Sequence, residues 1–253
     1  MRRRVIADIL ESWPYDPDGI SFRLIPGEDG REKLQIRLDL GILQLELDGR
    51  PDGLRPFGYD SVLDWHEGRV EELRGTTGAA AYSLPPTDCE ALRAEAVQVY
   101  QRYFRLFQIG RFDQVIADTS RNLRCLDFVF EHAELETDRW SLESYRPYIV
   151  MVNSLARCER DLAADDSESA ARVLRLGLAT IRRFVAEHEE RFGAAQELEV
   201  LAERLKEIER LVPRDEVERL QQRLAGAVAR EDYETAAQLR DQLDRVLPPP
   251  PGA

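Results

Sequence analysis

Apolar and polar residues alternate in two short runs near the beginning of the chain. The first run extends from Phe22 to Ile25, and the second extends from Lys33 to Leu40. Residues 27–30 separate them with the sequence Gly-Glu-Asp-Gly, which is typical of a tight turn. A period of two residues on both sides of such a turn predicts a β-hairpin.

The alternation changes phase at Gly41 and resumes from Leu43 to Leu47. A bulge or a sharp bend at Gly41 would account for this change. A helix over residues 34–47 is the rival interpretation, because Leu, Gln and Glu are good helix formers. We favour strands, and we expect a β-rich module over residues 1–58.

The helical period of 3.6 residues dominates after this module. Residues 60–73 are predicted to form a helix that Asp60 or Ser61 caps. Turn residues are frequent from Gly75 to Pro86. We therefore expect a helix and a linker over residues 59–87.

Two helical hairpins are predicted within an array at residues 88–212. The first turns at Gly110, where the string G-R-F-D-x-V-I follows an aromatic helix, and it resembles the hairpin of tetratricopeptide repeats. The second turns at residues 165–167, which lie 55 residues later rather than the about 34 of those repeats. We therefore expect a tetratricopeptide-like array with an insertion or divergence. The leucine spacing in residues 194–211 resembles a short coiled-coil seam.

Two further apolar stripes at helical spacing lie near the end of the chain. They comprise Val217, Leu220, Leu224 and Ala227 in a first helix and Tyr233, Ala236, Leu239, Leu243 and Val246 in a second. Arg230 and Glu231 belong to the turn between them, and Asp232 is placed to cap the second helix. The pattern predicts a helical hairpin over residues 213–247. A hairpin of this length buries too little apolar surface to be stable alone. It must therefore pack against another surface of the same chain, a second copy or another protein.

The second helix of this hairpin begins with the string E-D-Y-E-x-A-A-x-L-R-D-x-L, from Glu231 to Leu243. This string resembles the UVR motif of the UvrB and UvrC excision-repair proteins, which also occurs in the adaptor McsA and in ClpC ATPases. The resemblance covers only the hairpin, about an eighth of the chain. It implies a docking element that binds another protein or a second copy of the chain. The residues expected to bind the partner are Leu220, Leu224, Tyr233, Ala236, Leu239, Arg240 and Leu243.

The charge of the chain argues against a nucleic-acid-binding surface. The formal net charge is −13 over 253 residues, whereas binding to a phosphate backbone depends on clustered Lys and Arg. No apolar run approaches the roughly 20 residues that span a bilayer. The three cysteines, Cys89, Cys125 and Cys158, are isolated, which indicates neither a zinc site nor a disulfide framework. We expect a cytoplasmic protein.

The sequence offers little catalytic chemistry. It contains no phosphate-binding loop, no kinase signature and no G-x-S-x-G string, and we expect no cofactor and no metal. His66 is the best acid–base candidate, although such a residue on an amphipathic helix is usually solvated, and His132 is expected on a helix surface. An enzyme or divalent-cation site in residues 34–67, around Asp48, Asp52 and His66, is the alternative function.

The sequence therefore predicts a mainly α protein of the α+β class. A small β-rich module, a tetratricopeptide-like helical array and a C-terminal helical hairpin are expected in that order, and residues 248–253 are expected to be a disordered tail. The leading hypothesis for function is a non-enzymatic scaffold or adaptor that docks a partner through the hairpin. Excision repair and a ClpC-type protease system are the settings that the resemblance suggests.

Overall fold

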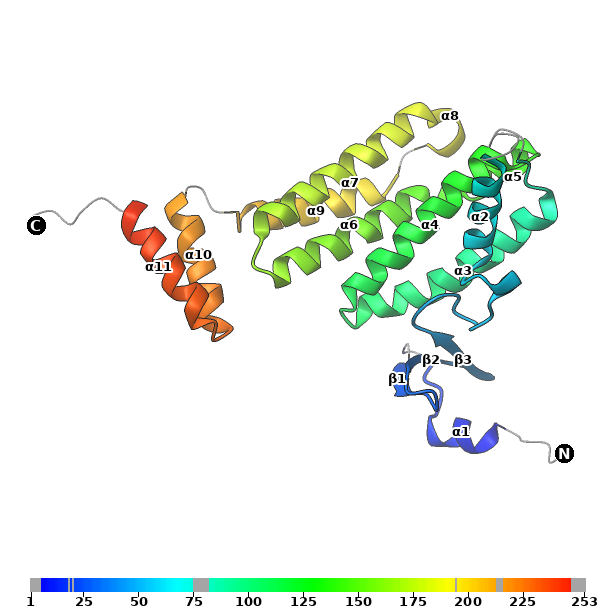
Figure 1. The fold of residues 1–253 in the computed structure, drawn as a ribbon, viewed down its shortest axis with the longest axis horizontal. Helices are drawn as coiled ribbons and strands as arrows, with labels where there is room; N and C mark the ends of the chain where they lie inside the picture. Colours follow the sequence, from blue (N-terminus) through cyan, green and yellow to red (C-terminus); the bar gives the residue numbers. More distant parts are fainter. Residues whose placement is uncertain are drawn as a thin grey trace, which may run out of the picture. The chain divides into compact units, whose positions relative to one another are not determined.

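The computed structural model describes residues 6–17, 19, 21–74, 82–193, 195–212 and 216–246. The predicted tail at residues 248–253 lies outside them. The chain divides into two compact units, Met1–Arg146 and Pro147–Ala253. The division falls inside the range 88–212 that was expected to form one array. The fold is mainly helical with one small sheet, as predicted (Figure 1).

The sheet of the first unit has three antiparallel strands in the order β1-β2-β3. The strands are β1 (Phe22–Pro26), β2 (Glu32–Leu38) and β3 (Gly41–Glu46). Leu34, Ile36 and Leu45 are buried on one face and form the core of the sheet. This excludes the helix considered for residues 34–47, since the strand pairing extends from Lys33 to Glu46.

The connection between β2 and β3 differs from the predicted bulge. Leu38 pairs with Gly41, so Asp39 and Leu40 form a two-residue turn, and Leu40 is fully at the surface. The second strand was expected to extend to Leu40, and it ends at Leu38. A reversal of the chain resets the alternation as a bulge would, which explains the phase change at Gly41.

The remaining elements are helices. The first unit contains α1 (Ala7–Ser12), η1 (Pro56–Gly58), α2 (Val62–Arg74), α3 (Pro86–Gln108), α4 (Phe112–His132), α5 (Glu136–Ser141) and η3 (Glu143–Tyr145), and α6 (Arg146–Ala163) begins at its boundary. The second unit contains α7 (Ser167–Glu187), α8 (Glu189–Phe192), α9 (Glu197–Glu209), α10 (Glu216–Ala229) and α11 (Tyr233–Val246). The tetratricopeptide-like character of the array stays a prediction.

Three helical hairpins use the same type of turn. Gly110, Asp165 and Glu231 each take a left-handed conformation after a helix, with φ of 73°, 58° and 59°. In each case the next amide donates to a carbonyl five residues earlier, as Asp166 does to Asp161 at 2.9 Å and Asp232 does to Ala227 at 2.9 Å. This pattern satisfies the last carbonyls of the first helix and reverses the chain.

Buried charges connect the sheet to the helices of the first unit. The Arg102 guanidinium on α3 donates to the Asp118 carboxylate on α4 at 2.6 and 2.8 Å, and both side chains are almost inaccessible to solvent. The remaining Nη1 of Arg102 donates to the carbonyls of Glu46 and Gly49 at 2.8 and 2.9 Å. One buried arginine therefore holds the end of β3 and its following loop on the α3–α4 pair.

Candidate functional site

The C-terminal hairpin is built from α10 and α11, which pack against each other in antiparallel order (Figure 1). Its core consists of four buried residues, Leu220, Ala227, Ala236 and Leu239, with Leu224 and Leu243 packed around them. The small side chains of Ala227 and Ala236 allow the two helix backbones to approach each other. The predicted helical hairpin is confirmed.

The turn of the hairpin is fixed by its acidic residues. Glu231 takes the left-handed conformation, and the Asp232 carboxylate accepts a hydrogen bond from the Thr235 amide at 3.1 Å. Hydrogen bonds from Thr235, first from its side chain and then from its amide, lower the pKa of Asp232. The capping role that the sequence predicts for Asp232 is therefore confirmed.

The structure places the seven predicted partner-binding residues in two environments. Leu220, Ala236 and Leu239 are buried inside the hairpin itself, and Leu224 and Leu243 are half-buried beside them. Tyr233 is 68% exposed, and Arg240 is exposed with Asp241 at 3.5 Å. A partner that binds the folded hairpin can therefore contact Tyr233 and Arg240, whereas Leu220 and Leu239 pack between the two helices and hold them together. The partner-binding role of all seven stays a prediction.

Sequence reasoning did not single out Val228 as a surface residue. It lies in the last turn of α10 and is 51% exposed, and Tyr233 lies in the first turn of α11. Both residues therefore lie at the end of the hairpin where α10 turns into α11, the turn end, and both expose apolar surface to solvent. The spacing did not indicate this exposure, because Val228 is four residues after Leu224 and therefore lies at the edge of the stripe formed by Leu220, Leu224 and Ala227.

The opposite side of α10 contacts the turn between α6 and α7. Arg219 pairs with Glu168 at 2.8 Å, and Arg230 pairs with the Asp165 carboxylate. A Cβ atom at Gly226 would overlap that carboxylate, so glycine permits the close approach. The hairpin therefore already has a polar contact with its own unit on this side, and Val228 and Tyr233 lie outside that contact.

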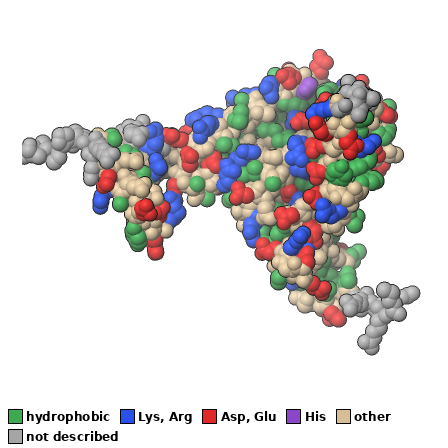
Figure 2. Space-filling model, in the orientation of Figure 1, with side chains coloured by type: hydrophobic (Ala, Val, Ile, Leu, Met, Phe, Trp, Pro, Cys, Tyr) green, Lys and Arg blue, Asp and Glu red, His purple; other side chains and the backbone are tan. Residues whose placement is uncertain are grey.

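Charges of both signs cover the hairpin and its surroundings. On the face shown in Figure 2, Lys and Arg side chains alternate with Asp and Glu and do not form a continuous basic patch. Together with the net charge of −13, this distribution is unfavourable for binding a phosphate backbone.

The residues of the alternative site in residues 34–67 have separate polar partners, and the enzymatic role stays a prediction. The Asp52 carboxylate accepts from Arg50 at 2.9 Å and from Gln98 at 3.3 Å, whereas His66 hydrogen-bonds to the Tyr82 hydroxyl. Among the residues that the structure describes, Asp52 and His66 share no polar partner. No group of three or more His, Cys, Asp or Glu suited to a metal ion occurs in the same residues.

His66 is buried rather than solvated, which corrects the sequence-based expectation. Its side chain is 1% exposed, and its ring contacts Trp65, Tyr82 and Phe128. Burial lowers its pKa, and Asp88 at 4.0 Å opposes that change. The residue is therefore part of an aromatic core between α2 and α4.

The loop after β3 has a structural contact that the sequence did not reveal. Arg50 in this loop pairs with Asp52 and, at 3.4 Å, with Glu95 on α3, whose side chain is completely buried. Glu95 also pairs with Arg121 and accepts a hydrogen bond from the Val62 amide at 2.8 Å. The loop therefore anchors the sheet to the start of α2 and to the α3–α4 pair.

Cys89, Cys125 and Cys158 are free and buried, and burial raises the pKa of each thiol to about 11. They are therefore poor nucleophiles at neutral pH. In the part of the chain that the structure describes, no helix has the length and apolar character needed to cross a bilayer.

Comparison with known proteins supports the interpretation of the hairpin. The family model described as the UvrB/uvrC motif matches residues 214–246, which include all of α10 and α11. The resemblance proposed from the string E-D-Y-E-x-A-A is therefore confirmed over those residues. The curated proteins and the solved structures gave no significant match.

Proposed function

We propose that this chain is a non-enzymatic interaction protein that docks a partner through the α10–α11 hairpin. The match of the UvrB/uvrC motif to residues 214–246 is the observation that carries this proposal. In the families that the hairpin resembles, the motif binds other proteins. The rest of the chain would then serve as a scaffold that presents the hairpin.

The partner would contact the turn end of the hairpin first. Val228 and Tyr233 are exposed there, and Tyr is among the residues that contribute most to binding at interfaces. Arg240, also exposed on α11, would supply a polar contact at the edge of this surface. The buried leucines would keep the two helices in the geometry that the partner recognises.

The resemblance suggests two settings for this interaction, excision repair and a ClpC-type protease system. The acidic character of the chain favours a protein partner over DNA in either setting. We propose a reducing compartment such as the cytoplasm, because the three buried thiols are unpaired.

Affinity purification of the tagged full chain tests this function. We expect one or a few proteins to be retained by the intact chain and lost when residues 214–246 are deleted, with mass spectrometry naming them. Circular dichroism of the deletion variant serves as the control that the remaining helices are folded. An identical set of retained proteins with and without the hairpin would contradict the proposal.

A further inference from the structure

The solvent-facing side of α7 is basic, although the chain as a whole is acidic. Residues 169–186 contain four arginines and no acidic residue, whereas the whole chain has 48 acidic residues against 35 basic ones. The acidic residues of α7 are confined to its ends, with Glu168 in the first turn and Glu187 at the last position. The middle of α7 is therefore a local region of positive charge.

The four arginines surround a small apolar centre on the exposed side of the helix. Leu174 and Ile181 are buried on the opposite side. The apolar centre consists of Leu176, which is 67% exposed, and Ala179, and a pair of arginines lies on each side of it along the helix. The α7 surface is the set of these six exposed residues, Arg172, Arg175, Leu176, Ala179, Arg182 and Arg183.

The guanidiniums of the α7 surface are mostly left without acidic partners. Arg175 pairs with Glu209 on α9 at 2.7 Å. Within the part of the chain that the structure describes, no carboxylate pairs with Arg172, Arg182 or Arg183. A guanidinium presents five N–H donors in a fixed planar arrangement. Three such groups are therefore available on this surface for carboxylates of another molecule.

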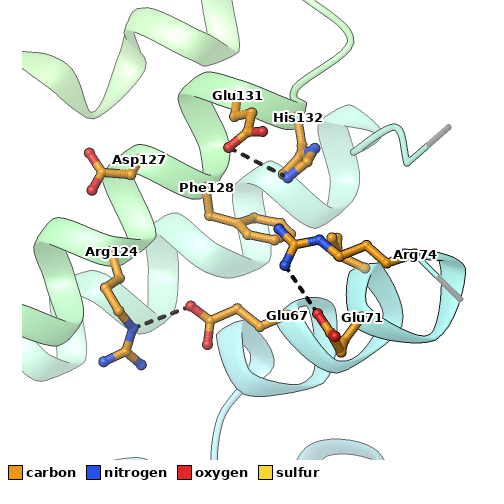
Figure 3. Close-up of a pocket in the computed structure, with 9 residues that line it drawn as sticks. Glu67, Glu71, Arg74, Arg124, Asp127, Phe128, Glu131 and His132 are labelled. Atoms are coloured by element: carbon orange, nitrogen blue, oxygen red, sulfur yellow. Dashed lines mark hydrogen bonds and ion pairs between the residues drawn. The ribbon is translucent and has the colours of Figure 1, made fainter. Parts of the chain in front are cut away.

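Arginines on α2 and α4 of the first unit provide a comparison. Figure 3 shows Arg74 directed at Glu71 and Arg124 directed at Glu67, with nitrogen–oxygen distances of 3.1 and 3.2 Å. Each of these pairs neutralises its own charge, so it attracts a charged partner only weakly. The α7 surface differs, because most of its positive charge is not offset by a neighbouring carboxylate.

The spacing of charge and apolar surface indicates the kind of partner. Arg172 and Arg183 are 11 residues apart, which corresponds to about 16 Å along the helix axis. Leu176 lies between them and exposes apolar surface, which a phosphate backbone does not use. A helix with an apolar stripe and acidic residues beside that stripe complements both features.

We propose that the α7 surface binds an acidic amphipathic helix of a partner protein. The apolar stripe of that helix packs on Leu176 and Ala179, and its Asp or Glu side chains pair with Arg172 and Arg183 at the two ends. Acidic residues elsewhere on the chain do not prevent this contact, because exposed charges more than about 8 Å apart are largely screened at physiological ionic strength. The surface uses no residue of the α10–α11 hairpin, so this proposal does not rest on the proposed function.

Fluorescence anisotropy of a labelled acidic peptide with the full chain tests this proposal. The peptide repeats the heptad Leu-Ala-Ala-Leu-Glu-Gln-Glu three times, which places leucines on one stripe and glutamates beside it. We expect saturable binding that weakens about fivefold between about 50 mM and about 300 mM salt. A peptide with the same residues in scrambled order, which has no apolar stripe, should bind at least about fivefold more weakly. No saturable binding, or equal binding of the scrambled peptide, would overturn the proposal.

A matched pair of double variants locates the binding on α7. Arg172→Ser with Arg183→Ser should weaken binding of the acidic peptide about fivefold, because two ion pairs are lost. Arg55→Ser with Arg69→Ser changes the net charge equally at exposed arginines of the first unit and should leave binding unchanged. Equal losses in the two double variants, or no loss in the first, would contradict the assignment to the α7 surface.

Leu176 distinguishes a helix from the other molecules that arginines can attract. Leu176→Ser should weaken binding of the acidic peptide about fivefold, whereas Leu211→Ser, at another exposed leucine of the second unit, should not. Duplex DNA that binds more tightly than the peptide, and equally well to Leu176→Ser, would overturn the proposal in favour of a nucleic acid. Self-association of the intact chain in sedimentation that Leu176→Ser abolishes would overturn it in favour of a second copy.

Discussion

Asp165 and Glu231 occupy equivalent positions in two helix–helix turns of the second unit, the turn between α6 and α7 and the turn between α10 and α11. Both take a left-handed conformation, with φ of 58° and 59°, and each is followed by an aspartate that caps the next helix. Asp166 accepts from the Ser169 amide at 2.8 Å, and Asp232 accepts from the Thr235 amide at 3.1 Å. The local sequences D-D-S-E-S-A-A and E-D-Y-E-T-A-A are correspondingly similar. The C-terminal hairpin therefore uses the same turn chemistry as the α6–α7 hairpin.

Glu231→Gly is expected to stabilise the hairpin. A residue with a Cβ atom loses roughly 1 kcal/mol in the left-handed region, and glycine removes that penalty. Amide hydrogen exchange of α10 and α11 should slow by about fivefold, the factor that corresponds to about 1 kcal/mol. Glu234→Gly, in the first turn of α11, is the matched control and should accelerate exchange, because glycine is unfavourable within a helix.

Asp118→Ala is expected to destabilise the first unit strongly. The substitution leaves the Arg102 guanidinium buried without its carboxylate, which costs about 4 kcal/mol. Urea unfolding of the full chain should show an early transition in the variant. Arg111→Ala is the matched control, since it breaks an exposed pair with Glu32 and should cost less than about 1 kcal/mol. A similar loss in both variants would contradict the structural role of the buried pair.

His66 predicts a dependence of stability on pH. Burial lowers the pKa of His66 in the folded chain. Below the usual histidine pKa of about 6.5, His66 therefore binds a proton more readily in the unfolded chain than in the folded chain. The free energy of unfolding of the first unit therefore has its full value above about pH 6.5. It falls as the pH decreases from there toward the pKa of His66 in the folded chain. His66→Gln should remove this slope between about pH 7 and pH 5, as measured by urea unfolding at each pH. His188→Gln, in the second unit, should leave the slope of the first unit unchanged.

The sequence predicts the elements well wherever one face is clearly apolar. The strand pattern around Leu34 and Ile36 and the stripe through Leu220 and Leu239 both identify the buried side chains correctly. The connection at Gly41 is different, because a bulge and a two-residue turn reset the alternation in the same way. The pattern alone cannot distinguish them.

Contacts between distant segments account for most of what the sequence did not predict. Glu95 lies in a charged helical run, and its complete burial depends on Arg50 and Arg121, which come from other elements. The burial of His66 likewise depends on ring contacts with Tyr82 and Phe128, which are distant in sequence. For the hairpin, the apolar stripe does not indicate whether its residues face the other helix or a partner, whereas the structure buries Leu239 and exposes Tyr233.

Retention of the partner by surface and core variants of the hairpin tests whether the chain docks through α10 and α11. Leu239→Asp with Leu243→Asp should abolish binding by unfolding the hairpin, because Leu239 belongs to its core. Val228→Ser with Tyr233→Ser should leave the helical content unchanged and reduce retention at least about tenfold, as expected for apolar contacts at the centre of an interface. Gln238→Ser, a polar exposed position on α11, should retain the partner fully. Undiminished retention by the folded Val228 and Tyr233 double variant would contradict docking through this surface.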